Sequence, residues 1–288
     1  NNKAVVVLVD RQQGWEKHLH VRDSVNDVII PVWSGMTLHD VRYHLITTLD
    51  VMQRCNLRSE ELNPIIAALD GRSWEEILPV AERLRTTGCI LKVNDLLLNN
   101  GIENLLPNLS VYGRVMADLK CHDIPNTVAN ICRRLCVCPP WAVTVHGSGG
   151  EEMIRAACKT LENTATKVLA VTVLTSINPE TCEEIYVRRP METVKTLAEI
   201  ARRAGAHGLV CSPEEVKELR ALYPNMTFVT PGIRSAGQDT DDQKRVATPQ
   251  AAIENGSNHL VMGRQVFGAK DPVAEVKRVV YEELKITL

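Results

Sequence analysis

One pattern repeats along the sequence from residue 64 to the C-terminus: a short apolar run rich in β-branched residues, followed by a longer stretch with helical periodicity. We count eight such pairs. Most runs are apolar at successive positions, which is typical of parallel strands that are covered on both faces. The pattern predicts strands at residues 64–70, 89–93, 114–120, 141–146, 167–173, 207–211, 227–230 and 258–262.

The stretches between these runs carry helix start and stop signals. Ser73 precedes residues 74–85, Ser212 opens the sixth stretch, and Gly88 and Gly205 close two others. Eight β/α pairs in about 220 residues match the size of a (β/α)8 barrel. We therefore predict an α/β fold, a (β/α)8 TIM barrel with a short α/β N-terminal appendage. In such a barrel the functional side chains come from the C-terminal ends of the strands.

Residues 1–60 break this rhythm. They predict a strand at 4–9, a turn at 10–14, a second strand at 28–32 and an amphipathic helix at 37–55. This is too little chain to enclose a hydrophobic core of its own. We expect an incomplete domain, or a segment that packs against something else, followed by a barrel domain at 61–288.

Composition argues against several classes of protein. A formal net charge of -2, from 33 basic and 35 acidic residues, provides no basic surface for a nucleic acid or an anionic membrane. Although 44% of the residues are hydrophobic, no run approaches the roughly 18 apolar residues that a membrane-spanning helix needs. Nine irregularly spaced cysteines, with no signal peptide ahead of them, indicate reduced thiols. We therefore expect a cytoplasmic protein that binds neither nucleic acid nor membranes.

Charged residues gather at the predicted strand ends. The third strand carries Asp118 and Lys120 two positions apart, and therefore on the same side of the strand, with Asp123 just past its end. Asp70 ends the first strand, and Lys92 lies near the end of the second. Ordinary ion pairs at strand ends are one interpretation of these residues. Five charges at one mouth of a barrel favour an active site instead.

These residues resemble the family of orotidine 5'-monophosphate decarboxylases. The family pattern D-x-K-x-x-D-I-P-x-T is complete here, running from Asp118 to Thr127. The resemblance extends from about residue 64 to the C-terminus and includes segments 68–70, 91–93, 172–176, 230–234 and 263–264. Asn94 departs from the pattern, which has glycine after the Lys-Val pair.

The resemblance implies a role for each catalytic charge. Asp118 would face the carboxylate of the substrate, and Lys120 would protonate C6 after carbon dioxide leaves. Lys92 and Asp70 would complete an alternating array of charges and bind ribose hydroxyls. Alternation keeps each buried group ionised, because each charge has an opposite neighbour.

The resemblance also implies a set of substrate-binding residues. After strand eight, backbone N–H groups and the guanidinium of Arg264 would hold the phosphate. Gln243 would bridge phosphate and pyrimidine, and Thr175 would contact the pyrimidine. Asp123 and Thr127 would reach into the site of a neighbouring subunit, which implies a homodimer with shared active sites. The implied binding residues are Asp70, Thr127, Thr175, Pro231, Gln243, Gly263 and Arg264.

The implied reaction is conversion of orotidine 5'-monophosphate to uridine 5'-monophosphate, without cofactor or metal. One alternative is a sugar-phosphate decarboxylase, or an aldolase-like enzyme, that holds a divalent metal among its acids. Another is a non-catalytic module that binds a nucleotide. Asp123 and the Gly-Arg pair favour the nucleotide, while a pure binding module would gain nothing from Asp118 beside a bound carboxylate. Cys132, Cys136 and Cys138 lack the spacing of a zinc site.

The N-terminal segment resembles the closing part of an orotate phosphoribosyltransferase, through residues 4–14 and the helix from Thr37. Ahead of a decarboxylase, it looks like the remnant of a bifunctional uridine monophosphate synthase. The part of a transferase that grips ribose pyrophosphate would lie upstream of Asn1, so we expect no transferase activity. His18 and His20 are expected to be surface or packing residues.

Overall fold

A computed structural model describes residues 5–9, 17–22, 27–32, 63–237 and 246–287. The chain divides into two compact units, residues 1–60 and 61–288. In the first unit, β1 (Val5–Val9), β2 (Lys17–Arg22) and β3 (Asp27–Val32) form an antiparallel sheet in the order β1-β2-β3. The two strands predicted here are confirmed. The predicted turn at 10–14 and helix at 37–55 lie outside the described residues.

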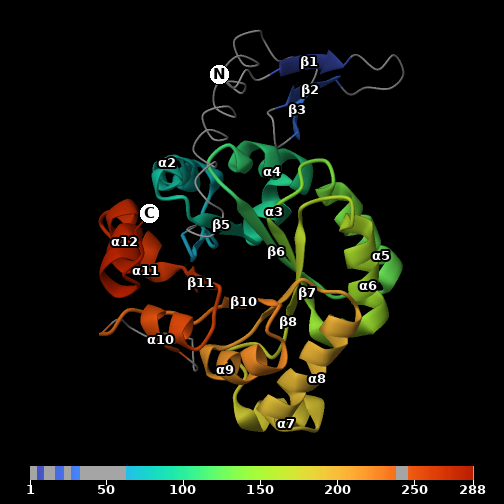
Figure 1. The fold of residues 1–288 in the computed structure, drawn as a ribbon, viewed down its shortest axis with the longest axis vertical. Coiled ribbons are helices and arrows are strands. Elements are labelled where there is room, and N and C mark those ends of the chain that lie inside the picture. Colours follow the sequence, from blue (N-terminus) through green and yellow to red (C-terminus); the bar gives the residue numbers. More distant parts are fainter. Residues whose placement is uncertain (1–4, 10–16, 23–26, 33–62, 238–245, 288) are drawn as a thin grey trace. The chain divides into compact units, whose positions relative to one another are not determined.

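The second unit contains a closed barrel of eight parallel strands (Figure 1), which confirms the predicted (β/α)8 fold. Each predicted strand is present: β10 has the predicted bounds, and each of the others differs from its prediction by one or two residues at one or both ends. Neighbours around the barrel follow chain order, and β11 pairs with β4 to close it. The strands are β4 (Ile65–Ala68), β5 (Ile90–Val93), β6 (Val115–Cys121), β7 (Ala142–His146), β8 (Lys167–Val171), β9 (Gly208–Val210), β10 (Thr227–Thr230) and β11 (His259–Met262).

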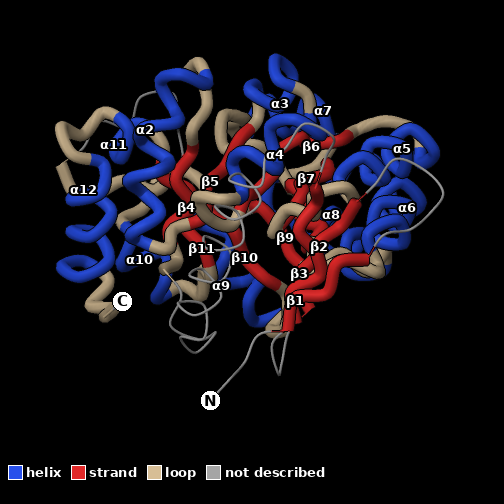
Figure 2. Tube along the Cα trace, turned by 90° about the horizontal axis from the view of Figure 1, so that it is seen from above, coloured by secondary structure: helices blue, strands red, loops and turns tan. Residues whose placement is uncertain are grey.

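The helices surround the strands (Figures 1 and 2). Sequence signals set several of their ends. Ser73 and Glu76 form a reciprocal capping box at the start of α2. After α2 the chain makes a 3-10 turn at Arg85–Thr87, which ends at Gly88 in the left-handed conformation, φ 69°. The helices are α2 (Trp74–Leu84), α3 (Asp95–Asn100), α4 (Ile102–Ser110), α5 (Pro125–Leu135), α6 (Gly150–Leu161), α7 (Pro179–Tyr186), α8 (Pro190–Arg203), α9 (Pro213–Leu222), α10 (Pro249–Glu254), α11 (Arg264–Phe267) and α12 (Pro272–Arg278), followed by a π-helical turn at Val279–Glu283.

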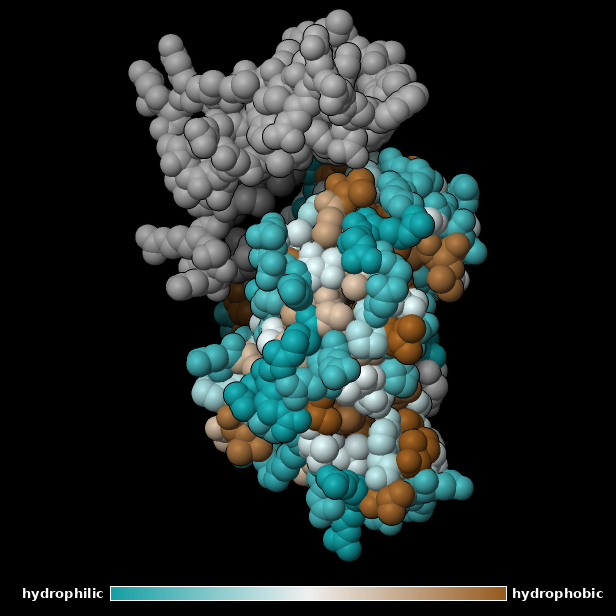
Figure 3. Space-filling view, turned by 90° about the vertical axis from the view of Figure 1, so that its right-hand side faces the viewer, coloured by the Kyte–Doolittle hydropathy of each residue, from teal (hydrophilic) through white to brown (hydrophobic). Residues whose placement is uncertain are grey.

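Two apolar layers hold the barrel together. Inside the barrel, apolar side chains from six of the strands pack together below the C-terminal mouth and form the floor of the lumen: Ile66, Ile90, Met116, Ala142, Leu169 and Val229. The larger layer lies between the strands and the helices. The face shown in Figure 3 is mostly hydrophilic, with separate small apolar groups, as expected for the outer sides of amphipathic helices. Within the described residues, every helix is too short or too polar to cross a membrane.

The same alternation places polar residues above the apolar floor of the lumen. Ile90 and Met116 belong to the floor, and Lys92 and Asp118 lie two positions further along the same strands. The barrel thus forms a rigid base for a polar site at its C-terminal mouth.

Candidate active site

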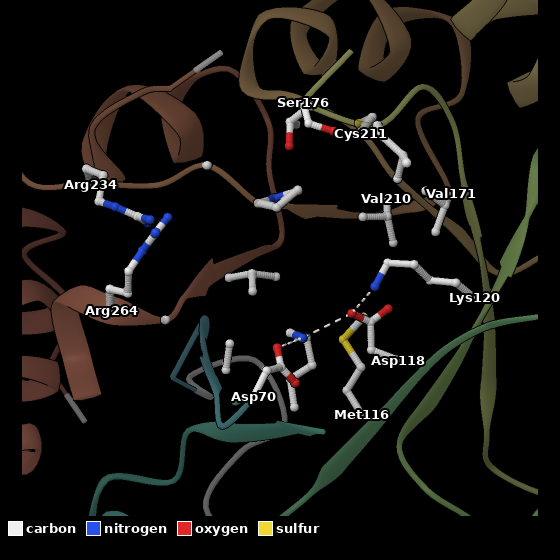
Figure 4. A pocket seen from close by; sticks show the side chains of 18 of the residues that line it. Asp70, Met116, Asp118, Lys120, Val171, Ser176, Val210, Cys211, Arg234 and Arg264 are labelled. Carbon is white, nitrogen blue, oxygen red and sulfur yellow. Dashed lines mark hydrogen bonds and ion pairs between the residues drawn. The ribbon is translucent and has the colours of Figure 1, made fainter. Parts of the chain in front are cut away.

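A pocket of about 600 Å³ opens at the C-terminal ends of the strands (Figure 4). Its polar wall comes from the turn after β4 and from β5 and β6, and its opposite wall comes from the segments that follow β8, β10 and β11. Of the residues predicted for the site, the pocket gathers Asp70, Lys92, Asp118, Lys120, Thr175, Pro231, Gly263 and Arg264.

Four charged side chains form an alternating chain across this pocket. Lys92 Nζ donates to Asp70 and, at 3.0 Å, to Oδ2 of Asp118. Lys120 Nζ donates to the same Oδ2 at 2.6 Å. The order is therefore acid, lysine, acid, lysine, the alternation that the family resemblance implies. Lys92 and Asp118 are each only 6% exposed, so their charges are held by each other more than by water.

Burial and pairing act against each other at Asp118 and Lys92. Burial alone would raise the pKa of Asp118, but the ammoniums of Lys92 and Lys120 outweigh it and hold that pKa below its ordinary value. Burial alone would lower the pKa of Lys92, but Asp118 and Asp70 raise it above its ordinary value. Both groups are therefore ionised at neutral pH.

An irregularity in β6 aims Lys120 at Asp118. The pairing of β6 with β7 shifts between Ala117 and Cys121, and Lys120 has a left-handed backbone with φ 46°. The hydroxyl of Thr144, on β7, accepts from the backbone N–H of Lys120 at 2.9 Å and donates to Oδ1 of Asp118 at 2.8 Å. Thr144 therefore fixes both residues of the pair, and the strain is confined to one residue that faces the pocket.

Asn94 forms a hydrogen bond with the backbone of β6 next to the irregularity. Its side-chain amide donates to the backbone carbonyl of Asp118 at 2.5 Å. The backbone of Asn94 has φ -127° and ψ -82°, so its φ lies outside the left-handed region that favours glycine, although the family pattern has glycine here. The roles of Asn94 and Thr144 were not predicted, because each depends on a contact between strands and not on a local motif.

Two arginines extend toward each other from the side of the pocket opposite Lys120 (Figure 4). Arg264 follows β11 and was predicted, whereas Arg234 follows β10 and was not predicted as a binding residue. The sequence did contain a signal for Arg234. It is the last residue of segment 230–234, at the C-terminal end of the seventh barrel strand, and this segment is part of the family resemblance. Two converging guanidiniums are suited to an anion with more than one negative charge.

Two of the described residues predicted for the site do not line this pocket, and a third predicted residue is not among those described. Asp123 is exposed, and its carboxylate accepts from the backbone N–H of Ile124 at 2.6 Å. Thr127 is half-buried on α5 and also lies outside the pocket. Gln243 lies outside the described residues. Their binding roles stay predictions.

Within the described residues, no group of three or more histidine, cysteine, aspartate or glutamate side chains is arranged to hold a metal ion. In the pocket, the ammonium of Lys92 lies between the carboxylates of Asp70 and Asp118. A divalent cation bound by these two acids would have to displace that ammonium.

The barrel and its charged pocket define an enzyme of the (β/α)8 class, with its site at the C-terminal mouth. The model of one family, "Orotidine 5'-phosphate decarboxylase / HUMPS family", matches residues 63–279. The chain belongs to this family.

Curated relatives agree with this assignment. A protein from Pseudomonas aeruginosa named "Orotidine 5'-phosphate decarboxylase" is 40% identical over 225 residues, which are 76% of this chain and 97% of the relative. A protein of the same name from Marinomonas sp. is 41% identical over 218 residues, 74% of this chain and 93% of the relative.

Solved structures share the fold. The crystal structure of orotidine 5'-phosphate decarboxylase from Lactobacillus acidophilus matches with a TM-score of 0.66 at 36% identity, over 76% of this chain and 98% of that one. An uncharacterized conserved protein from Geobacillus kaustophilus matches with the same TM-score at 30% identity, over 76% and 99%.

Proposed function

We propose that this chain decarboxylates orotidine 5'-monophosphate to uridine 5'-monophosphate in pyrimidine biosynthesis. The observation that carries the proposal is the alternating chain Asp70, Lys92, Asp118 and Lys120 in the pocket of a family member. A buried carboxylate with a lowered pKa stays charged beside an anionic substrate, and a lysine next to it can supply a proton.

The carboxylate of Asp118 would face the carboxylate of the substrate. Two such charges about 4 Å apart repel by about 4 kcal/mol at an effective dielectric constant near 20. The bond between C6 and the carboxyl carbon breaks, carbon dioxide leaves without charge, and the electron pair stays on C6. The repulsion is thereby relieved in the course of the reaction.

Lys120 would complete the reaction as the proton donor. Its ammonium lies 2.6 Å from Asp118 and is therefore held beside the position of the departing carboxylate. The positive charge stabilises the developing carbanion, and the ammonium then transfers a proton to C6. Solvent returns the proton to Lys120 after the product leaves. Lys92 and Asp70 would hold the ribose hydroxyls and keep Asp118 in place.

The opposite wall would bind the rest of the nucleotide. The guanidiniums of Arg234 and Arg264 would hold the phosphate dianion, together with backbone N–H groups near Gly263. Thr175 and Pro231 would contact the pyrimidine, and Gln243 would bridge pyrimidine and phosphate. Because these anion contacts are local, they are compatible with a net charge of -2.

We further propose that the active unit is a homodimer in which Asp123 and Thr127 complete the pocket of the partner. Both residues follow β6 but lie outside the pocket of their own chain. Ile124, next to Asp123 in the sequence, is 65% exposed, and Leu98 on α3, which follows the neighbouring strand β5, is 81% exposed. A second copy would cover such side chains.

The eight free cysteines among the described residues support a reducing compartment, the cytoplasm.

The direct test is the loss of orotidine 5'-monophosphate absorbance, with and without a chelator. We expect equal rates in the two conditions, and a large loss of turnover in Asp118→Asn. Retained binding of uridine 5'-monophosphate by Asp118→Asn serves as the control for folding.

Other outcomes distinguish the alternatives. Binding without turnover in the parent would indicate a nucleotide-binding module. Activity that the chelator removes, or activity on a sugar phosphate only, would favour the metal-dependent alternative.

A further inference from the structure

Two buried polar residues lie directly next to the two pocket arginines in the sequence. Ser235 follows Arg234, and Gln265 follows Arg264; they are 7% and 8% exposed. The two residues exchange a pair of hydrogen bonds. The backbone N–H of Ser235 donates to Oε1 of Gln265 at 2.9 Å, and Nε2 of Gln265 donates to Oγ of Ser235 at 2.5 Å. The segments after β10 and β11 are thereby joined one residue away from each arginine.

The C-terminal helices hold this pair from behind. Gln265 Nε2 donates its second proton to Oε1 of Glu275 on α12 at 2.7 Å. The hydroxyl of Ser235 donates to Oε1 of Glu283, in the π-helical turn, at 2.5 Å. Arg278 lies between the two acids and donates to Glu275 at 2.7 Å, to Glu283 at 2.8 Å and to Oγ of Ser235 at 3.0 Å.

Every polar atom of the two side chains has a hydrogen-bond partner. The Ser235 hydroxyl donates once and accepts twice, and the Gln265 amide donates twice and accepts once. The amide has one favourable orientation, because a flip would place Oε1 against the carboxylate of Glu275. That carboxylate is charged, since hydrogen bonds from Arg278 hold the pKa of Glu275 below its ordinary value. A fully satisfied buried network of this kind has one geometry.

The pocket arginines need such a constraint. Both are positive and extend toward each other, so in the absence of an anion their repulsion favours separation. Neither arginine lies within a barrel strand: Arg234 belongs to the connection after β10, and Arg264 is the first residue of the short helix α11. Recognition of a dianion depends on a fixed spacing of its donors, since a small misplacement removes much of the binding free energy.

We propose that Ser235 and Gln265 are positioning residues that set the spacing of Arg234 and Arg264 for the phosphate of the substrate. This proposal rests on the proposed function, because it takes a phosphorylated nucleoside as the ligand. The network formed by Ser235, Gln265, Glu275, Arg278 and Glu283 would then contribute to substrate selection without contacting the ligand, because it acts through the two arginines.

The test compares Gln265→Leu and Ser235→Ala with the parent, using ligands with and without phosphate. By calorimetry we expect each variant to bind uridine 5'-monophosphate about tenfold more weakly, with uridine binding unchanged. In kinetics we expect KM for the nucleotide to rise by a similar factor, while kcat/KM for the phosphate-free nucleoside stays at the parent value. Ser235→Thr keeps the hydroxyl and the N–H, and should keep the affinity of the parent.

Thr166→Val is the matched control. Thr166 is also buried, at 2% exposed, and donates to the carbonyl of Pro140 at 2.7 Å, at the N-terminal end of the barrel. Its loss should lower stability and leave the ratio of nucleotide to nucleoside affinity unchanged.

Equal losses of uridine and uridine 5'-monophosphate binding in Gln265→Leu would overturn the proposal, as would unchanged nucleotide binding in both variants. If Gln265→Leu fails to fold, the milder Ser235→Ala decides by the same ratio. Failure of the proposed function is a separate result. A parent that binds uridine 5'-monophosphate but does not turn over its carboxylated precursor would refute the reaction, and the binding ratios would still test the network.

Discussion

At the scale of single residues, Lys120 combines an unfavourable backbone with a central position. A left-handed conformation costs a non-glycine residue about 1–2 kcal/mol, and Lys120 adopts it with φ 46°. The surrounding hydrogen bonds from Thr144 and Asn94 stabilise the irregular strand end. With this backbone conformation, Nζ of Lys120 reaches the carboxylate of Asp118. A regular strand end with the same two residues would not require that contact.

Replacement of Lys120 by alanine should therefore remove turnover and preserve binding. We expect kcat to fall more than a thousandfold in Lys120→Ala, because the substitution removes the proposed proton donor and the positive charge proposed to lie beside C6. Binding of uridine 5'-monophosphate, measured by calorimetry, should remain detectable. Lys159→Ala, on the exposed side of α6, is the control. A kcat within tenfold of the parent would rule out Lys120 as the proton donor.

A second residue predicts a pH dependence of stability. Burial, together with the charges of Arg114 and Lys167, lowers the pKa of His259 from 6.5 to about 4. The buried Nδ1 of His259 has no hydrogen-bond partner among the described residues, so a proton there would be unsatisfied. Between pH 6.5 and 4 the unfolded chain binds a proton that the folded chain does not. His259 should therefore reduce the unfolding free energy as the pH falls through this window, by about 3 kcal/mol in total.

Urea unfolding of His259→Gln at several pH values tests this expectation. Comparison at pH 8, where the imidazole is neutral in both states, measures the effect of the substitution on packing alone. The unfolding free energy of the variant should then depend less steeply on pH than that of the parent between pH 6.5 and 4. Parallel curves for the two proteins would contradict the lowered pKa.

The charged residues of the site could be predicted because their positions follow from local rules. A period of two places Asp118 and Lys120 on one side of a strand, and parallel strands in a barrel bring their C-terminal ends together. Thr144 and Asn94 were missed for a physical reason. Their roles depend on the register shift between β6 and β7 and on the backbone of a neighbouring strand, which no single motif specifies.

At the scale of elements, the eight barrel strands were predictable because each is an unbroken apolar run covered on both faces. β2 in the N-terminal unit was missed. Its sequence Lys-His-Leu-His-Val-Arg alternates polar and apolar residues at its centre, the pattern of a strand with one polar face. A search for apolar runs alone cannot find such a strand, whereas a search for alternating polar and apolar residues would find it.

One helix end contains an avoidable strain. Val187 follows α7 with φ 56° and ψ 30°, and its side chain is 87% exposed. A β-branched residue is poorly suited to this conformation and gains almost no burial here. Val187→Gly should raise the unfolding free energy by about 0.5–1 kcal/mol, because removal of the Cβ strain exceeds the entropy that glycine adds to the unfolded chain.

The measurement is urea or thermal unfolding, with Val187→Ala as the matched variant. Alanine removes the same exposed apolar group but keeps the Cβ, so its gain should be clearly smaller than that of glycine. A glycine variant less stable than the parent would show that Val187 makes a contact worth more than the strain.

At the scale of the whole molecule, the proposed function divides the pocket into two parts. Alternating charges on β5, β6 and the turn after β4 line one wall, and the two arginines extend from the opposite wall (Figure 4). In the proposed function the first wall would face the reacting end of the substrate and the second its phosphate. We therefore expect a substitution in the charged wall to leave phosphate binding intact, and a substitution in the arginine wall to leave the charged chain intact. This division also leaves Asp123 and Thr127 without a task in their own pocket, although they complete the same sequence motif as Asp118 and Lys120.

A mixture of two inactive variants tests whether these residues act in the pocket of a partner. Lys120→Ala and Asp123→Ala should each be inactive as homodimers. If Asp123 serves the partner subunit, a mixed dimer has one pocket with both substitutions and one pocket with neither. Random exchange at equal concentrations makes about half of the dimers mixed, so activity should return to about one quarter of the parent value.

Subunit exchange is followed by native mass spectrometry of differently tagged chains, and activity is measured on the same samples. Lys120→Ala mixed with Asp118→Asn is the control, because both substitutions lie in the same pocket of one chain. Here the mixed dimer has one lesion in each pocket, and activity should stay absent. Failure of the first mixture to recover, despite demonstrated exchange, would place Asp123 in the site of its own subunit, because only a residue that crosses the interface can restore an intact pocket.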